Sequence, residues 1–278
     1  MSIDPAELPA LGKHFIEQGW VRVAMPDPAP ALAARDAMLA LLRRQLSPNL
    51  ATIADYHLFI GDDETKHTSL QQQLTELFWH ERFGQRIVAA QADFFTRFVG
   101  LDLHVQKYPY VRMARPGLRQ DNIGVHRDTQ YGASPYELSV WIPYGDLDAG
   151  GGLKVLSGSH LVPEAAFEFE QRPDPVVTKG SQKHKLGFPY APRALKGDVE
   201  SRMQPVPIRL GEMLIFSLSL VHGQSINAGA GTRLSTDIRL VNSLAPIEWQ
   251  RSVHADYYEP LCQSPVTAQA KRYYAAGP

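Results

Sequence analysis

The sequence predicts a mainly β fold with flanking helices (α+β), in which an N-terminal helical part packs on a double-stranded β-helix core of the jelly-roll or cupin-like type. In the first hundred residues, strong helix formers place apolar side chains at steps of three and four residues. From about 100 to 245, short apolar or alternating runs are separated by Gly, Pro and Asp, a pattern typical of a β sandwich or barrel. No internal repeat or low-complexity tract divides the 278 residues, so we expect a single domain over 1–278.

Helices are expected first, at 6–19, at 29–46 and, as one or two helices, at 69–98, with a strand at 20–24. The core strands are expected at 103–113, 123–131, 136–143, 153–157, 206–209, 212–221 and 233–242.

A long stretch bearing Pro and Lys, 171–204, interrupts the strand pattern, and loops of this length are often lids or binding loops. Its charged residues lean basic, with Arg172, Lys179, Lys183, His184, Lys185, Arg193 and Lys196 against Asp174, Asp198 and Glu200. Phe167, Phe188 and Tyr190 add apolar surface. If this stretch is a lid, its basic character suits an anionic or polar substrate. That it is simply a solvated, mobile loop is an equally good interpretation.

Composition narrows the class of partner. With 28 basic and 29 acidic residues the formal charge is −1, so no global field recruits nucleic acid or an anionic membrane. The single Cys262 excludes an intrachain disulfide and argues against a Cys-rich zinc or iron–sulfur site. The N-terminus has no secretory pattern, and no stretch reaches the roughly 20 apolar residues of a membrane span. We expect a cytoplasmic protein, monomer or homodimer, that acts on a small molecule.

A candidate metal site starts with His126 and Asp128. Two residues apart on an extended strand, they point to the same side. One imidazole and one carboxylate are two of the three ligands of a 2-His-1-carboxylate triad, which suits non-haem Fe(II) and leaves coordination positions open. His222 is the candidate third ligand, because it continues the core-facing row of Leu214, Phe216, Leu218 and Leu220. The alternatives are a surface turn at 126–128 and a core histidine bonded to a backbone carbonyl.

Four stretches carry a resemblance: GVHRDT at 124–129, LSVWIP at 138–143, GGLKVLSGSH at 151–160 and HGQSIN at 222–227, the last followed by Arg233. Together they resemble the phytanoyl-CoA dioxygenase-like branch of the Fe(II)/2-oxoglutarate-dependent oxygenases. The similarity runs from about 100 to 242 and, more faintly, over 15–23.

The resemblance implies that His126, Asp128 and His222 bind Fe(II) and that Arg233 holds the distal carboxylate of 2-oxoglutarate. A guanidinium offers a carboxylate a planar bidentate fork, which burial strengthens. An ordinary salt bridge to Asp237 is the alternative for Arg233. Arg239 shares its phase and is the competing candidate, but the spacing of Arg233 from His222 fits the family.

Further residues are assigned to the 2-oxoglutarate pocket. Thr129 and Trp141 resemble positions beside it, although either side chain fits wall packing as well. Gln106 and Tyr110 share a face with His104, Tyr108 and Arg112, a polar row that would line the cavity inside a barrel. Where the family often has a small hydroxyl residue two after the distal histidine, this chain has Gln224, with Ser225 next. The segment 157–160 reads as a structural turn.

The expected activity is that of a dioxygenase that uses Fe(II), O2 and 2-oxoglutarate to hydroxylate an unactivated C–H of a small metabolite or natural product, with release of succinate and CO2. Asp128 fills the position that related halogenases leave to chloride, which favours hydroxylation. Desaturation, cyclisation and epimerisation share the same iron centre. The rival hypotheses are a cupin-like isomerase or hydrolase with another divalent metal and a non-catalytic β-sandwich binding module.

Overall fold

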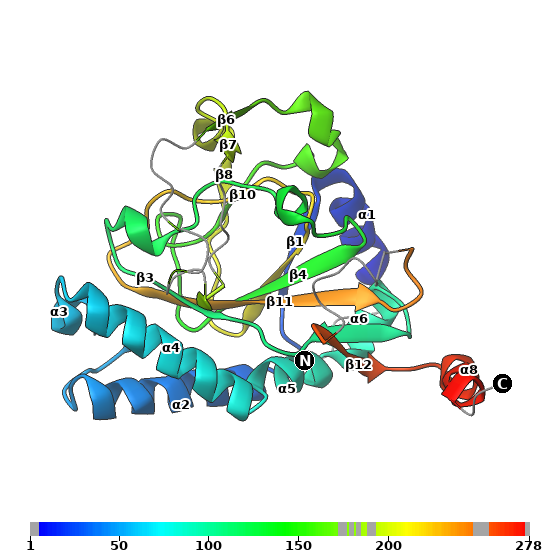
Figure 1. The fold of residues 1–278 in the computed structure, drawn as a ribbon, viewed down its shortest axis with the longest axis horizontal. Helices are drawn as coiled ribbons and strands as arrows, with labels where there is room; N and C mark the ends of the chain where they lie inside the picture. Colours follow the sequence, from blue (N-terminus) through cyan, green and yellow to red (C-terminus); the bar gives the residue numbers. More distant parts are fainter. Residues whose placement is uncertain are drawn as a thin grey trace.

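The architecture is a twisted antiparallel sheet, called here the major sheet, between a layer of helices and a smaller sheet with long loops (Figure 1). A computed structural model describes residues 6–171, 177, 181, 185–187, 193–246 and 256–275. Within them the seven-stranded major sheet has the order β1-β9-β4-β11-β2-β12, with β3 beside β11. Its strands are β1 (Trp20–Ala24), β2 (Leu103–Gln106), β3 (Val111–Ala114), β4 (Glu137–Pro143), β9 (Glu212–Ser217), β11 (Arg233–Asn242) and β12 (Tyr258–Cys262).

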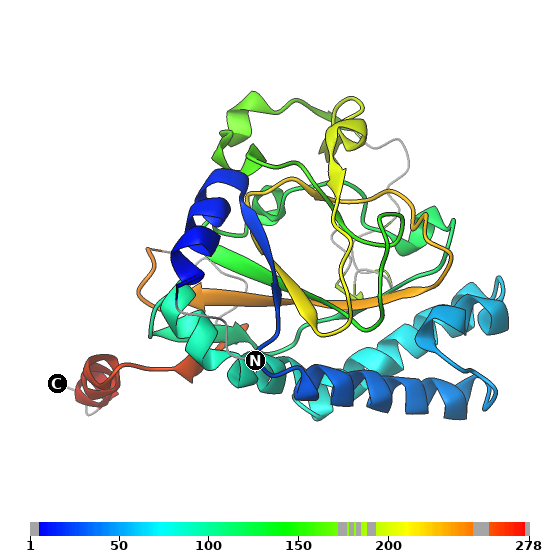
Figure 2. The ribbon, with the colours of Figure 1, turned by 180° about the vertical axis from the view of Figure 1, so that it is seen from behind.

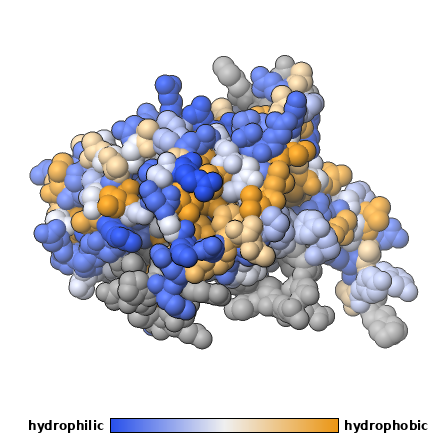
Figure 3. All heavy atoms as spheres, turned by 90° about the horizontal axis from the view of Figure 1, so that it is seen from above, coloured by the Kyte–Doolittle hydropathy of each residue, from blue (hydrophilic) through white to orange (hydrophobic). Residues whose placement is uncertain are grey.

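The opposing minor sheet has the order β10-β5-β8, and a separate ribbon pairs β6 with β7. These strands are β5 (Lys154–Val155), β6 (Phe169–Gln171), β7 (Arg193–Leu195), β8 (Gln204–Pro205) and β10 (His222–Gly223). The molecular face above the minor sheet mixes hydrophilic and hydrophobic patches (Figure 3). Two antiparallel sheets facing each other, with helices on the outside, confirm the predicted mainly β jelly-roll class.

The helices precede the core in sequence, and the long ones run along the outer face of the major sheet (Figures 1 and 2). They are α1 (Leu8–Gln18), α2 (Ala29–Gln45), α3 (Tyr56–Ile60), α4 (Glu64–His80), α5 (Phe83–Ala90) and α6 (Ala92–Phe98), with α8 (Pro265–Ala275) near the C-terminus. The stretch 69–98, predicted as one or two helices, is divided among α4, α5 and α6. The break between α4 and α5 lies at Arg82, which adopts a left-handed conformation with φ 53°, and α4 begins earlier than predicted, after the capping Asp63. No helix in the described ranges combines the length and apolar composition that crossing a bilayer requires.

Strand alternation divides the buried residues between two cores. In β11, Ile238 and Leu240 pack in the large core between the major sheet and the helices. Arg233 and Arg239 have the opposite phase and face the space between the two sheets. On the same inner side, Trp141 packs in a second core with Leu153, Val155, Val206, Ile208, Leu214, Phe216 and Leu220. The inner face of β11 is therefore where charged side chains meet the jelly-roll interior.

Five predicted strands differ in the structure. The run 212–221 ends at Ser217, before a turn at 218–220, and the run 153–157 pairs only over Lys154–Val155. The run 103–113 is two strands, β2 and β3, because Pro109 has no N–H to pair in a ladder. The run 206–209 forms only an isolated bridge between Leu147 and Ile208, with Pro205 and Pro207 on either side of 206. The run 123–131 is wrong as a continuous strand: His126 makes one bridge with His222, and a 3-10 helix begins at Asp128.

The predicted lid at 171–204 stays a prediction, because much of it lies outside the described residues. That applies to Arg172, Asp174, Lys179, Lys183, His184, Phe188 and Tyr190. In the described part, the carbonyls of Leu186 and Gly187 accept hydrogen bonds from Arg112 at 3.0 and 2.7 Å. Leu186 also packs with Val177 and Ile123. These contacts attach residues 185–187 to the inner side of β3.

Candidate metal centre

His126 and His222 are brought together by paired backbone hydrogen bonds. The N–H of each donates to the carbonyl of the other, at 3.0 and 2.9 Å, and the two ring centroids are 4.4 Å apart. Asp128 is fixed by its own N–H, which donates to Leu218 at 3.0 Å where the chain turns out of β9. Arg127 between them is extended, with φ −120° and ψ 139°, so the predicted same-side orientation of His126 and Asp128 is confirmed although the strand ends there.

The donor atoms of the three side chains converge. Asp128 Oδ1 lies 3.6 Å from His126 Nε2, and Asp128 Oδ2 lies 3.7 Å from His222 Nε2. One ligand atom from each residue lies within 4.8 Å of the others, and all three residues are buried. Nδ1 of His126 is 2.9 Å from the carbonyl of Gly124, and Nδ1 of His222 is 2.9 Å from that of Leu220. Because Nδ1 carries the proton in these bonds, each Nε2 keeps its lone pair for a metal. This donor set fits a divalent iron ion.

The charges of the cluster also suit metal binding. Burial raises the pKa of Asp128, but Arg239, His222 and His126 outweigh it and hold the pKa well below the usual value. Burial, with His126 beside it, lowers the pKa of His222 to about 3, so this imidazole is neutral near pH 7. A metal ion needs an ionised carboxylate and a neutral imidazole, and this environment favours those forms at Asp128 and His222.

The two competing arginines have different partners. Arg239 donates to Asp128 Oδ2 at 2.8 Å and pairs with Asp237 at 3.1 Å. Arg233 forms no ion pair among the described residues; it donates from Nη1 to the carbonyl of Gly151 and from Nη2 to Asn122 Oδ1, at 3.2 and 2.9 Å. Its Nε is buried without a partner in the described part of the chain. Burial lowers the pKa of Arg233 to about 10 against the opposing effect of Asp121, so a buried cation without an ion pair among the described residues remains for an anionic group.

Other predicted pocket residues are engaged elsewhere. Gln106 is on the inner face as predicted, but its Oε1 accepts from the N–H of Arg239 at 3.1 Å. Tyr110 lies between β2 and β3, with Arg112 5.6 Å from its ring centroid and Trp79 edge-on at 5.4 Å. Their roles at the cosubstrate stay predictions.

Three more of these positions lie around the triad. Thr129 donates to Glu164 at 3.2 Å. Trp141 belongs to the inner apolar core. The N–H of Ser225 donates to Glu200 at 3.1 Å, and it is the preceding Gln224 that turns inward, 2% exposed, towards Arg233. The structure thus places Gln224, rather than Ser225, beside the arginine.

Sequence reasoning missed Asn122 and Tyr257. Asn122 sits in a stretch rich in Asn and Asp that reads as an ordinary turn. Burial raises the pKa of Tyr257, and Arg239 is the charge that acts on it most, so this C-terminal residue lies close to the inner face of β11. The contact of Asn122 with Arg233 joins residues 111 apart in the chain, so the local sequence carries no signal of it.

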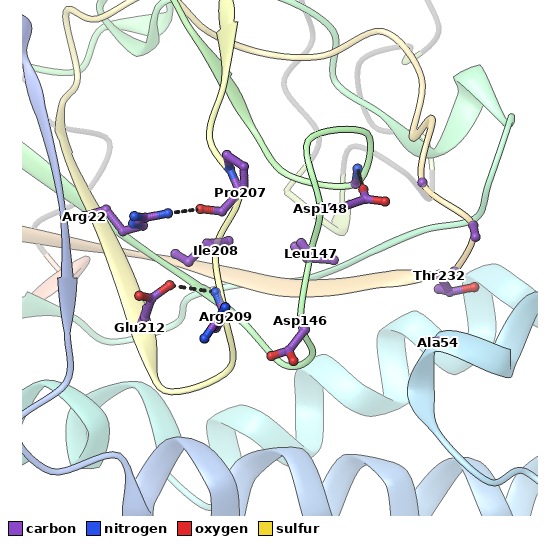
Figure 4. A pocket seen from close by; sticks show the side chains of 14 residues that line it. Arg22, Ala54, Asp146, Leu147, Asp148, Pro207, Ile208, Arg209, Glu212 and Thr232 are labelled. Atoms are coloured by element: carbon purple, nitrogen blue, oxygen red, sulfur yellow. Dashed lines mark hydrogen bonds between the residues drawn. The ribbon is translucent and has the colours of Figure 1, made fainter.

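A pocket of about 710 Å³ opens elsewhere, lined by residues that include Arg22, Asp146, Asp148, Glu212 and Thr232 (Figure 4). Its polar groups are largely used within the wall: Arg22 donates to the carbonyl of Pro207, and Glu212 accepts from Arg209 N–H at 2.7 Å. None of the triad residues lines it. Gly151 lines this pocket, and its carbonyl accepts a hydrogen bond from Arg233.

Comparison with solved structures identifies proteins of the same fold. Among solved structures, the chain is similar to the apo form of the non-heme monooxygenase ThoJ, with a TM-score of 0.53 and 19% identity over 84% of this chain and 77% of that one. The ThoJ–Ni complex gives 0.52 and 18% over 96% and 95%. EvdO2 from Micromonospora carbonacea var. aurantiaca, complexed with 2-oxoglutarate, gives 0.51 and 14% over 86% and 91%. At these identities the likeness shows the shared fold.

No functionally curated protein matches the sequence significantly. The model of the phytanoyl-CoA dioxygenase family, by contrast, matches residues 29–235, well over half of the 278 residues, and the match includes the inward-facing triad and Arg233. The chain therefore belongs to the phytanoyl-CoA dioxygenase family, a family of Fe(II)- and 2-oxoglutarate-dependent oxygenases.

Proposed function

We propose that this protein is an Fe(II)- and 2-oxoglutarate-dependent dioxygenase that hydroxylates an unactivated C–H of a small polar or anionic molecule. The convergence of three buried ligand atoms within 4.8 Å carries the proposal. The fold shared with ThoJ, solved as a nickel complex, and with EvdO2, solved with 2-oxoglutarate, supports it.

In this proposal His126 and His222 each hold the iron through Nε2, and Asp128 holds it through one carboxylate oxygen. Iron bound with 2-oxoglutarate supplies the oxidising chemistry, in which O2 delivers one oxygen atom to the substrate and one to succinate while CO2 is lost. Arg233 binds the distal carboxylate and so orients the cosubstrate. The Nδ1 hydrogen bonds of both histidines keep their rings from turning, which fixes the position of the metal.

Arg239 orients the carboxylate ligand, and the inner core excludes water. By donating to Asp128 Oδ2, Arg239 holds the carboxylate in one orientation and keeps it ionised. Trp141 and the apolar residues around it keep water out of the space between the sheets. Arg112 pairs with Asp237 at 3.9 Å on the same inner face. The arginines of this face, Arg112, Arg233 and Arg239, outnumber Asp128 and Asp237 by one, and this suits a polar or anionic substrate.

The test is cosubstrate turnover. Fe(II) and 2-oxoglutarate added anaerobically should give a visible charge-transfer band, and O2 should then release succinate. Asp128→Ala should lower succinate release at least 100-fold, because it removes a metal ligand. Asp93→Ala, which changes an exposed carboxylate on α6, is the matched control and should behave as the unaltered protein. Turnover that survives Asp128→Ala undiminished would exclude this site.

A further inference from the structure

Arg233 is surrounded by hydrogen-bond acceptors that carry no charge. The carbonyl of Gly151 and Oδ1 of Asn122 each accept from it. In the amide orientation that satisfies its neighbours, Gln224 accepts a third bond from Nη1 and donates to the carbonyl of Gly152. We call this set, Asn122, Gln224 and the Gly151 carbonyl, the neutral cradle.

The neutral cradle leaves a defined part of the guanidinium unused. Arginine has five N–H groups, and the three acceptors take two on Nη1 and one on Nη2. The groups that remain are on Nε, which is buried without a partner in the described residues, and on Nη2. Two N–H groups are what a bidentate carboxylate pair requires.

The cradle is itself fixed in place. Asn122 Nδ2 donates to the carbonyl of Leu118 at 3.0 Å, which sets the direction of its Oδ1. The loop that carries it is anchored by Arg115, which binds both oxygens of the buried Asp121 at 2.8 and 2.9 Å. The negative charge of Asp121, one residue from Asn122, is paired with Arg115, and it raises the pKa of Arg233 less than burial lowers it.

We propose that Asn122 and Gln224 are positioning residues that orient Arg233 without neutralising it, so that the site selects a 2-oxo acid with a second, distal carboxylate. This inference rests on the proposed function and adds the residues that set cosubstrate selectivity. An ordinary buried arginine is paired with a carboxylate, because an isolated charge is costly to bury. Here a charged partner in the cradle would occupy the cation permanently and exclude the cosubstrate.

The test compares two acids that differ in the distal carboxylate, 2-oxoglutarate and 2-oxobutyrate. Their affinities for the Mn(II)-loaded protein are measured by anaerobic calorimetric titration. The unaltered protein should bind 2-oxoglutarate at least tenfold more tightly. Asn122→Asp and Gln224→Glu should each weaken 2-oxoglutarate binding at least tenfold and change 2-oxobutyrate binding less than twofold. Asn122→Ala should weaken 2-oxoglutarate binding by less than Asn122→Asp does, because it loosens Arg233 without neutralising it.

Asn49→Asp, which adds the same charge at an exposed position, is the control and should leave both affinities unchanged. If Asn122→Asp does not fold, Gln224→Glu decides. The inference is overturned if the folded charge variants bind 2-oxoglutarate within threefold of the unaltered protein, if they lose both acids equally, or if Asn122→Ala is the more damaging change at residue 122. Failure of the unaltered Mn(II)-loaded protein to bind either acid would instead overturn the proposed function, and the inference with it.

Discussion

His126 and His222 owe their orientation to one shared local arrangement. In each, Nδ1 bonds to the carbonyl two residues earlier in the chain, and Nε2 turns towards Asp128. The backbone therefore sets the tautomer and the ring direction before any metal binds. This preorganisation reduces the entropy that the ligands lose on binding.

The lowered pKa of His222 makes the metal-free protein sensitive to acid. An unfolded histidine takes up a proton near pH 6.5, whereas the folded His222 has a pKa of about 3 and stays neutral. Stability is therefore fully present above about pH 6.5 and decreases as the pH falls towards 3. Between pH 7 and pH 5 we expect a loss of about 2 kcal/mol from this residue. Urea unfolding at the two pH values measures it.

The variant His222→Asn isolates this effect, because half-buried His104 also has a lowered pKa and adds to the same trend. The variant should lose less stability than the unaltered protein between pH 7 and pH 5. Equal losses in the two proteins would show that His222 is protonated as readily in the folded state as in the unfolded one.

The sequence predicted the site residues whose positions follow from strand phase and residue spacing. The spacing of His126 and Asp128 placed these two on one side. The phase of His222 assumes a continuous strand over 212–222, but β9 ends at Ser217, and it is the bridge between His126 and His222 that brings the third residue to the pair. Phase did not separate Arg233 from Arg239, because both lie on the inner face of β11. The family spacing from His222 favoured Arg233, and in the structure the partners separate the two: Asp128 and Asp237 bind Arg239, and neutral groups bind Arg233.

At the scale of elements, Gly223 allows β10 to approach the chain at 124–126. Its φ of 111° is rarely adopted by other residues, and a Cβ there would collide with the carbonyl of Gly124. That carbonyl is the acceptor for Nδ1 of His126. The close pairing of the two histidines thus depends on a residue without a side chain.

Gly223→Ala should consequently separate His126 from His222 and weaken Mn(II) binding at least tenfold. Gly197→Ala is the matched control, because Gly197 also has a positive φ, of 82°, but no atom within 4 Å of a built Cβ. The Gly197→Ala variant should have the backbone strain of a positive φ without a steric clash, and it should therefore keep its Mn(II) affinity. Calorimetric titration measures both variants. Equal Mn(II) affinities for the two would contradict the role given to Gly223.

Element boundaries were less predictable than element types. Helices and strands were identified where an apolar period ran for many residues, as in α2 and β11. The short 3-10 helix at Asp128–Tyr131 was not foreseen, because its start depends on bonds from Asp128 and Thr129 to the distant Leu218. Such long-range contacts leave no periodic trace in the local sequence.

At the scale of the whole molecule, one core joins the helices to the major sheet. Apolar residues of α2, α4 and α5 pack in the same cluster as residues of β2, β4, β9 and β11. The helical part therefore has no separate core of its own in the described residues. This shared core is what a single domain would have, although the sequence changes from helical to strand patterns near residue 102. The single domain over 1–278 stays a prediction.

A single cooperative unfolding transition is the expected consequence. In differential scanning calorimetry the metal-free protein should give one peak, with calorimetric and van't Hoff enthalpies that agree. Mn(II) at about 100 times its dissociation constant should stabilise the protein by about 2.7 kcal/mol and move that peak upwards as one. Two resolved peaks, of which only one responds to Mn(II), would indicate that the helices and the jelly roll unfold separately.

The central claim is that His126, Asp128 and His222 hold one metal ion while Arg233 holds the far end of 2-oxoglutarate. A crystal structure of the protein with Mn(II) and 2-oxoglutarate, using anomalous scattering to locate the metal, tests it most directly. We predict one metal at about 2.1 Å from Nε2 of both histidines and from an Asp128 oxygen, with the distal carboxylate on Arg233. A metal bound elsewhere, or a distal carboxylate bound to Arg239, would contradict it.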